Sequence, residues 1–311
     1  MPLAPEYQSM LDELAKTPGP AFTDLTPAEG RDMYRLMRPV NPELEVANVL
    51  EHSIDSTSAS GPSIPIRIYI PAGAGPFPVY VNYHGGGWVI GDLDTADAVC
   101  RDLCNTVPCV VVSVDYRLAP EHPYPAAVED CFEAVSWAAK NMALLNGNGK
   151  IAVGGESSGG NLAAVVCLKA RDEGGPRIDF QLLLYPVTDA NLTRQSYQDN
   201  GEGYILETAT MAWFWDYYCP DVATRTQQYA SPLQAENLSN LPPALVITAE
   251  FDPLRDEGMA YAQALSDAST PAEAVCYDGL VHDFFATAQI FQVSRPGFER
   301  ACGALRTAFE G

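Results

Sequence analysis

The stretch IAVGGESSGGNLAAVV, residues 151–166, decides the architecture of this chain. Residues 151–155 form a short apolar run, typical of a strand that is buried on both faces. Residues 161–174 have the composition and spacing of a helix, and the turn GESSG (155–159) joins the two. A Gly-x-Ser-x-Gly turn between a buried strand and a helix exposes its serine at the end of the strand. The stretch therefore predicts a sheet covered by helices, with Ser157 as a candidate nucleophile.

The same alternation of strands and helices continues on both sides of this stretch. Two extended segments, 49–55 and 64–71, come first. Short apolar strands are then predicted at 78–84, 109–116, 180–186, 244–250 and 272–277, and helices at 96–106 and 126–141. Such alternation predicts an α/β fold with a mostly parallel central sheet and helices on both faces.

Two segments depart from this rhythm. Residues 1–45 look helical and amphipathic, with interruptions at Pro18, Pro20, Pro27, Pro39 and Pro42. Residues 188–233 separate two strands by more than an ordinary crossover and contain the aromatic run WFWDYY. We expect 188–233 to be a helical insertion over the carboxyl edge of the sheet, and an ordinary packing helix is the alternative. The predicted core is then 46–187 together with 234–311.

Charge and composition exclude several classes of function. The 311 residues include 40 acidic and 18 basic side chains, which give a net charge of −22. Nucleic acid and anionic membrane surfaces would repel such a chain, so neither is an expected partner. Solubility is the simplest interpretation of the charge, and adaptation to salt is a second one.

The chain start and the cysteines indicate the expected compartment. The first twenty residues have neither a basic start nor an apolar run, so we predict no secretory signal. No segment approaches the roughly 18 apolar residues that a membrane span requires. The eight cysteines are scattered, without the paired spacing of a zinc site. We therefore expect a cytoplasmic protein with reduced thiols, no metal and no cofactor.

A glycine-rich turn, HGGGW (84–88), follows the strand predicted at 78–84. Glycines let the backbone approach a ligand and direct its N–H groups toward developing negative charge. We assign the amides of Gly86, Gly87 and Ser158 as oxyanion donors. A phosphate-binding loop is the rival, but its lysine and its glycine spacing are absent. A plain loop and an idle serine are the simpler alternatives for the two turns.

A serine nucleophile requires a base and an acid, and chain order selects both. Nucleophile-elbow hydrolases place them in the order Ser, Asp or Glu, His. Of four histidines, only His282 follows Ser157. Asp252 lies two residues beyond the strand predicted at 244–250, in the place where an acid would orient the imidazole. Asp256 is the rival, although we expect it in the first turn of the next helix, where a carboxylate favours the helix dipole.

These motifs together resemble the hormone-sensitive-lipase-like esterases, bacterial lipolytic family IV of the α/β-hydrolases. The matching segments are NYHGGGWVIGDLD (82–94), VDYRLAPEHPYPAA (114–127), VGGESSGGNLAA (153–164), LYPVTD (184–189), DPLRDEG (252–258) and VHDF (281–284). The resemblance implies an α/β-hydrolase fold, a helical cap made of 1–45 and 188–233, and a preference for short to medium acyl chains. It also implies a homodimer. Glu156, Ser158 and Asp283 depart from the commonest family pattern.

The predicted function is therefore that of a carboxylesterase acting on a small-molecule ester through Ser157, His282 and Asp252. Trp88, Trp213 and Phe214 are the candidates for the wall of the substrate pocket. An amidase or peptidase using the same triad is one alternative. A small-molecule receptor is another, although the plant gibberellin receptors that resemble this family lack the histidine present here.

Overall fold

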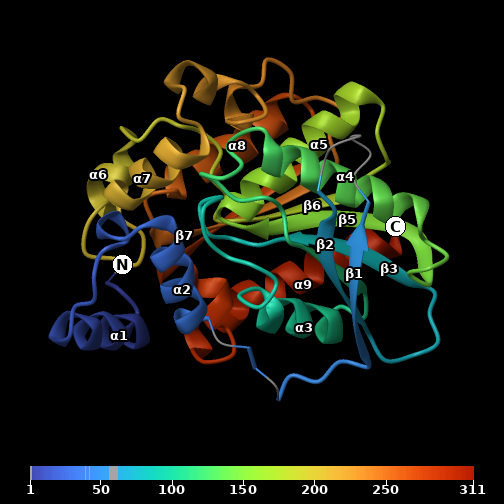
Figure 1. Cartoon of the computed structure of the whole chain (residues 1–311), viewed down its shortest axis with the longest axis horizontal. Helices are drawn as coiled ribbons and strands as arrows, with labels where there is room; N and C mark the ends of the chain where they lie inside the picture. The colour runs from blue at the N-terminus through green and yellow to red at the C-terminus, as the bar shows by residue number, and fades with distance from the viewer. Residues whose placement is uncertain (1, 39, 42, 56–61) are drawn as a thin grey trace.

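The computed structural model describes residues 2–38, 40–41, 43–55 and 62–311. Within them, eight strands form one sheet in the order β1-β2-β4-β3-β5-β6-β7-β8 (Figure 1). The strands are β1 (Asn48–Ile54), β2 (Ile64–Ile70), β3 (Phe77–Tyr83), β4 (Val110–Val114), β5 (Gly147–Glu156), β6 (Phe180–Leu184), β7 (Ala244–Phe251) and β8 (Ala272–Val281).

The sheet is mostly parallel, as the sequence predicts. β1 pairs antiparallel with β2, and β2 pairs antiparallel with β4. All the remaining neighbours, from β4 to β8, pair in parallel. Their carboxyl ends therefore meet at one edge of the sheet, and loops that leave β3, β5, β7 and β8 can bring distant residues together there.

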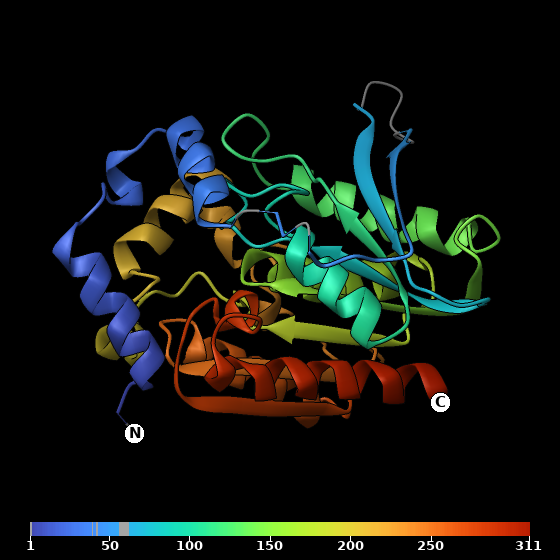
Figure 2. The ribbon, with the colours of Figure 1, turned by 90° about the horizontal axis from the view of Figure 1, so that it is seen from below.

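Helices cover both faces of the sheet (Figures 1 and 2). One face carries α4 (Ala126–Lys140), α5 (Ser158–Glu173) and α8 (Arg255–Asp267), and the other carries α3 (Asp97–Thr106) and α9 (Arg295–Glu310). Side chains alternate along each strand, so Val79 and Val81 pack with the first layer and Tyr80 with the second. The predicted α/β architecture is confirmed.

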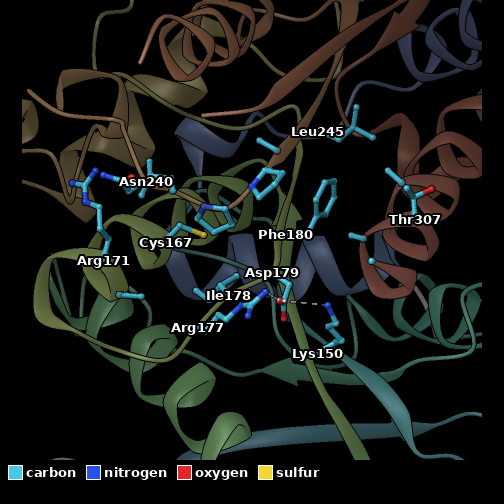
Figure 3. Close-up of a pocket in the computed structure, with 18 of the residues that line it drawn as sticks. Lys150, Cys167, Arg171, Arg177, Ile178, Asp179, Phe180, Asn240, Leu245 and Thr307 are labelled. Carbon is cyan, nitrogen blue, oxygen red and sulfur yellow. Dashed lines mark ion pairs between the residues drawn. The ribbon is translucent and has the colours of Figure 1, made fainter. Parts of the chain in front are cut away.

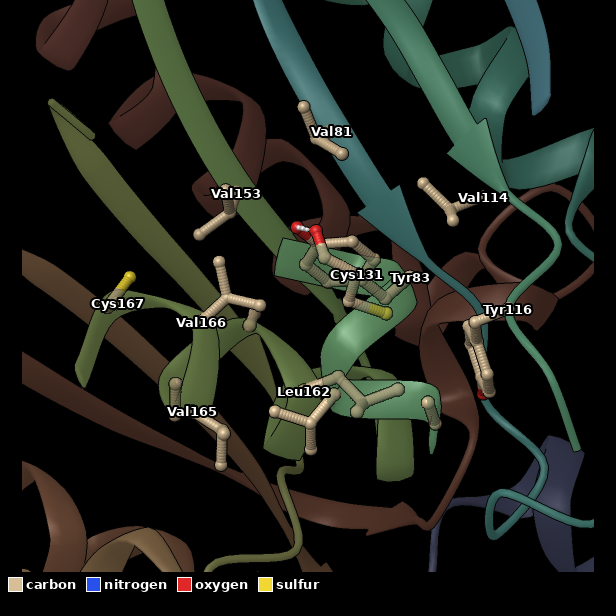
Figure 4. Packing of buried hydrophobic residues seen from close by; sticks show 14 of the residues in the cluster. Val81, Tyr83, Val114, Tyr116, Cys131, Val153, Leu162, Val165, Val166 and Cys167 are labelled. Carbon is tan, nitrogen blue, oxygen red and sulfur yellow. Dashed lines mark hydrogen bonds between the residues drawn. The ribbon is translucent and has the colours of Figure 1, made fainter. Parts of the chain in front are cut away.

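The packing of α4 and α5 on the sheet holds the serine turn in place. Val81, Val153 and Leu162 lie together in this buried layer (Figure 4). Tyr83 belongs to the same buried layer, and its hydroxyl group donates a hydrogen bond to the carbonyl oxygen of Cys131 in α4, at 3.0 Å. Burial of apolar surface stabilises the fold by roughly 25 cal/mol per Å². This packing therefore fixes β5 and α5, and with them the turn that joins the two.

The two segments outside the core lie together at the carboxyl edge of the sheet. They comprise α1 (Pro5–Lys16) and α2 (Pro27–Met37) from the chain start, and α6 (Gln195–Asn200) and α7 (Thr208–Tyr218) from residues 188–233 (Figures 1 and 2). Pro27 begins α2 instead of interrupting it, because Thr26 and Glu29 form a capping box in front of it. Pro39 and Pro42 lie outside the described residues.

Three arginines in α2 and directly after it fix this helix to the core. Arg31 forms a two-pronged ion pair with Glu121, and Arg35 pairs with Asp92. The third, Arg38, follows the last residue of α2 and turns its side chain into the protein. Arg31 and Arg35 are four residues apart and share one side of the helix, and Arg38 reaches the core from the residue after it.

The far edge of the sheet lies opposite these segments. The chain ends there, after α9, whereas the chain start lies beside α1 at the carboxyl edge (Figure 2). All eight cysteines are free thiols, and seven of them are buried. Among the described residues, no helix is both long enough and apolar enough to cross a bilayer.

Candidate active site

Ser157 stands at the sharp turn between β5 and α5. Its backbone has a φ of 55° and a ψ of −117°, a conformation that an ordinary side chain rarely adopts and that costs of order 1–3 kcal/mol. Gly155 and Gly159 make the turn feasible, because a Cβ atom on either would collide with the carbonyl oxygen of Tyr83. The turn is held by the Ser157 amide, which donates to the carbonyl oxygen of Leu184 at 2.9 Å.

His282 and Asp252 reach Ser157 from the ends of two other strands. His282 directly follows β8, and its Nε2 lies 3.1 Å from the Oγ of Ser157. Asp252 directly follows β7, and its Oδ2 lies 2.7 Å from Nδ1 of His282. A carboxylate at Nδ1 keeps the proton on that nitrogen, which leaves Nε2 free to accept the proton of the serine.

Asp252 is completely buried and is fixed by the backbone of its own turn. Its Oδ1 accepts a hydrogen bond from the amide of Leu254 at 2.8 Å. Its rival, Asp256, lies in the first turn of α8 and accepts from the amide of Ser196 and from Arg255. Of the two carboxylates, the structure brings Asp252 and not Asp256 to the histidine.

The predicted oxyanion loop lies beside the serine. Gly86 and Gly87 have φ values of 119° and 57°, which favour glycine. A Cβ atom on Gly86 would collide with the carbonyl oxygen of Ile90, and one on Gly87 with the ring of Phe214. Within the described part of the chain, neither amide has a hydrogen-bond acceptor. Ser158 begins α5, where the first amides have no partner inside the helix.

A small cavity of about 70 Å³ opens above Ser157 and His282. Its wall combines the core with the N-terminal segment and the segment 188–233. The lining residues are Phe22, Tyr34, Met37, Gly85, Gly86, Gly87, Ile90, Ser157, Ile205, Leu206, Thr210, Phe214, His282 and Asp283. No motif in the sequence marked the lining residues contributed by the N-terminal segment. Phe22 lies in a short 3-10 helix, and Tyr34 and Met37 lie in the amphipathic helix α2, and neither helix has a catalytic pattern.

The three aromatic residues predicted for the pocket wall occupy different positions. Phe214 lines the cavity. Trp213 lies behind it, edge-to-face against Phe214 and Tyr217. Trp88 is completely buried and stacks on Tyr218 at 4.1 Å. The structure therefore places Trp88 and Trp213 in the layer that supports the cavity and not in its lining, since helix periodicity and stacking turn them away from it.

A larger hollow of about 810 Å³ lies at the far edge of the sheet (Figure 3). Lys150, Phe180 and Leu245, near the starts of β5, β6 and β7, line it together with Thr307 of α9. Ligands of open α/β sheets bind outside the carboxyl ends of the strands. The large hollow lies at the opposite ends and contains no member of the Ser157 cluster, so the small cavity is the candidate active site.

His84 illustrates how burial acts on the charges around this cavity. Its ring stacks on Tyr116 at 4.2 Å, and its Nδ1 donates to the carbonyl oxygen of Gly85 at 2.8 Å. Burial lowers the pKa of His84 from 6.5 to about 4. The side chain is therefore neutral near pH 7 and adds no positive charge to the glycine loop that follows it.

A strand–turn–helix serine that meets a histidine and an aspartate at the carboxyl edge of a parallel sheet is the arrangement of the α/β-hydrolase class. A family model described as alpha/beta hydrolase fold matches residues 80–286. The chain belongs to this α/β-hydrolase family, and its resemblance to the hormone-sensitive-lipase-like esterases is confirmed.

Several relatives with similar sequences or structures carry esterase names. Carboxylic ester hydrolase LipN from Mycobacterium tuberculosis is 46% identical over 262 residues, covering 81% of this chain and 70% of that protein. Esterase LipI from the same organism is 41% identical over 288 residues, covering 90% and 87%. The crystal structure of a thermostable esterase from Pseudomonas putida is 39% identical, with a TM-score of 0.93 over 99% of this chain and 98% of that one.

Proposed function

We propose that this protein is a carboxylesterase that hydrolyses short- to medium-chain acyl esters. The observation that carries the proposal is the continuous contact from Ser157 Oγ through His282 to Asp252, at 3.1 and 2.7 Å, on the wall of a small cavity. The esterase names of relatives at 36–46% identity support the choice of an ester as substrate.

In the proposed reaction, Ser157 Oγ attacks the carbonyl carbon of the ester while His282 Nε2 takes the serine proton. Asp252 keeps the imidazole in the useful tautomer and stabilises the imidazolium. The amides of Gly86, Gly87 and Ser158 donate to the oxyanion, and His282 then gives its proton to the leaving alcohol. Water repeats the sequence on the acyl-enzyme, which regenerates the serine.

The cavity at Ser157 has a volume of about 70 Å³, which favours acyl groups of few carbon atoms over long chains. Residues 1–45 and 188–233 supply much of its wall, and we assign them the role of a cap over the site. The predicted homodimer and cytoplasmic location stay predictions from the sequence.

The proposal is tested with purified protein and p-nitrophenyl esters from acetate to dodecanoate. We expect the highest kcat/KM at or below octanoate, and a loss of roughly a millionfold in kcat for Ser157→Ala. Turnover that persists in Ser157→Ala would rule out the assigned nucleophile. A matched set of anilides distinguishes the amidase alternative, because the same chain would then cleave the C–N bond at least as well as the ester.

A further inference from the structure

Arg38 connects the N-terminal segment to both residues that flank the catalytic pair. It follows α2, and its side chain is only 9% exposed. One guanidinium nitrogen lies 3.3 Å from Oε2 of Glu156, the residue before Ser157. The other terminal nitrogen donates to Oδ1 of Asp283, the residue after His282. A single cation therefore touches the neighbours of the nucleophile and of the base.

Glu156 extends this contact to the imidazole. Its second oxygen, Oε1, accepts a hydrogen bond from the Tyr185 hydroxyl at 2.5 Å. The ring of Tyr185 meets the ring of His282 edge-to-face, with centroids 4.8 Å apart. Arg38 and Tyr185 thus bind the carboxylate of Glu156 from two sides, and the Tyr185 ring also packs against the ring of His282.

The charge on Arg38 is secure in this position. Burial alone would lower the pKa of Arg38, but its contacts, among them the ion pair with the Glu156 carboxylate, outweigh burial, and the pKa is raised above its ordinary value. The Tyr34 ring supports the guanidinium at 5.2 Å. Without the cation, Glu156 would remain buried with no ion-pair partner among the described residues, and Asp283 would lose its ion pair.

We propose that Arg38 is a positioning residue. By binding Glu156 and Asp283 at the same time, it fixes the positions of Ser157 and His282 relative to each other. The inference rests on the proposed esterase function. It also assigns a role to Glu156 and Asp283, both of which depart from the commonest pattern of the family. The guanidinium suits this role, because its planar fork binds two carboxylates in fixed directions whereas an ammonium group acts as a point charge.

The test compares Arg38→Met with Arg35→Met. Each variant removes one arginine near the C-terminal end of α2, but Arg35 pairs with Asp32 and Asp92, neither of which adjoins Ser157 or His282 in the chain. We expect Arg38→Met to lose roughly 10- to 100-fold in kcat with KM nearly unchanged, because small displacements of reacting groups have effects of that size. Arg35→Met should retain kcat. Equal losses in both variants, or a change confined to KM, would overturn the proposal.

A second measurement tests the role of Arg38 independently of the proposed esterase activity. The rate at which a fluorophosphonate labels Ser157 depends on its activation by His282 and needs no ester turnover. If the wild type labels but hydrolyses no ester, the esterase proposal fails, and the labelling rates of Arg38→Met and Arg35→Met still decide the role of Arg38. We expect slower labelling in Arg38→Met alone.

A conservative variant and a double-mutant cycle cover the case in which Arg38→Met does not fold. Arg38→Lys keeps the charge but not the fork, so we expect a kcat between those of the wild type and Asp283→Asn. The losses of Arg38→Lys and Asp283→Asn should be less than additive, since both weaken one contact. Full activity of Arg38→Lys together with full activity of Asp283→Asn would contradict the inference.

Discussion

At the scale of single residues, the orientation of the histidine is the most sensitive feature of the site. Asp252 is completely buried and meets Nδ1 of His282 at 2.7 Å. Asp252→Asn keeps the shape but favours the wrong tautomer, so we predict a fall of roughly 10⁴-fold in kcat. Steady-state kinetics on p-nitrophenyl butyrate measure the effect. Asp256→Asn is the control, and a comparable loss there would show that the acid has been misassigned.

His84 gives a prediction about stability and pH. Burial lowers its pKa to about 4, whereas the unfolded chain has an ordinary value near 6.5. Between these values the unfolded chain binds the proton and the folded protein does not, so the fold loses stability as pH falls through this window. The full effect is about 3 kcal/mol. Urea unfolding between pH 7 and pH 4 should therefore show a shallower decline for His84→Gln than for the wild type.

The sequence alone identified the residues whose chemistry is rare. Four histidines and a fixed chain order left one candidate base, and the strand ends selected Asp252 over Asp256. Arg38 could not be found in this way. Its partners lie 118 and 245 positions away, and a surface helix with several arginines gives no sign of which one turns inward.

At the scale of elements, α7 controls the depth of the cavity. Phe214 lines it and presses against Gly87, while Trp213 faces away in the supporting layer. Phe214→Ala should raise the ratio of kcat/KM for octanoate over butyrate by roughly tenfold, because it opens space for further methylenes. Trp213→Ala should leave this ratio unchanged. A ratio that moves equally in both variants would show that α7 acts through general loosening.

The strands and helices of the core follow the predicted positions closely, because buried parallel strands and amphipathic helices carry strong local patterns. The departures have both local and tertiary causes. Pro27 begins α2 because its missing amide hydrogen is no loss at a helix start. The rotation of Trp88 and Trp213 away from the cavity depends on stacking partners that are remote in sequence or set by the helix, so residue type alone did not reveal it.

At the scale of the whole molecule, the net charge of −22 leads to a prediction about salt. Like charges repel across a compact surface, and the Debye length falls to about 10 Å at 0.1 M salt. We therefore expect the Tm to rise between 10 mM and 200 mM sodium chloride. Choline chloride should have the same effect if screening is responsible. A falling Tm would mean that weakened ion pairs outweigh the relief of repulsion.

The positions of the two chain ends matter for anyone who attaches the protein to a support. The chain start lies at the same edge of the sheet as the cavity, whereas α9 runs to the far edge (Figure 2). A linker added after Gly311, which is exposed, would leave the mouth of the cavity facing the solution. Beads or electrodes coupled through the C-terminal end should thus keep substrate access, while coupling through the first helix would crowd the entrance.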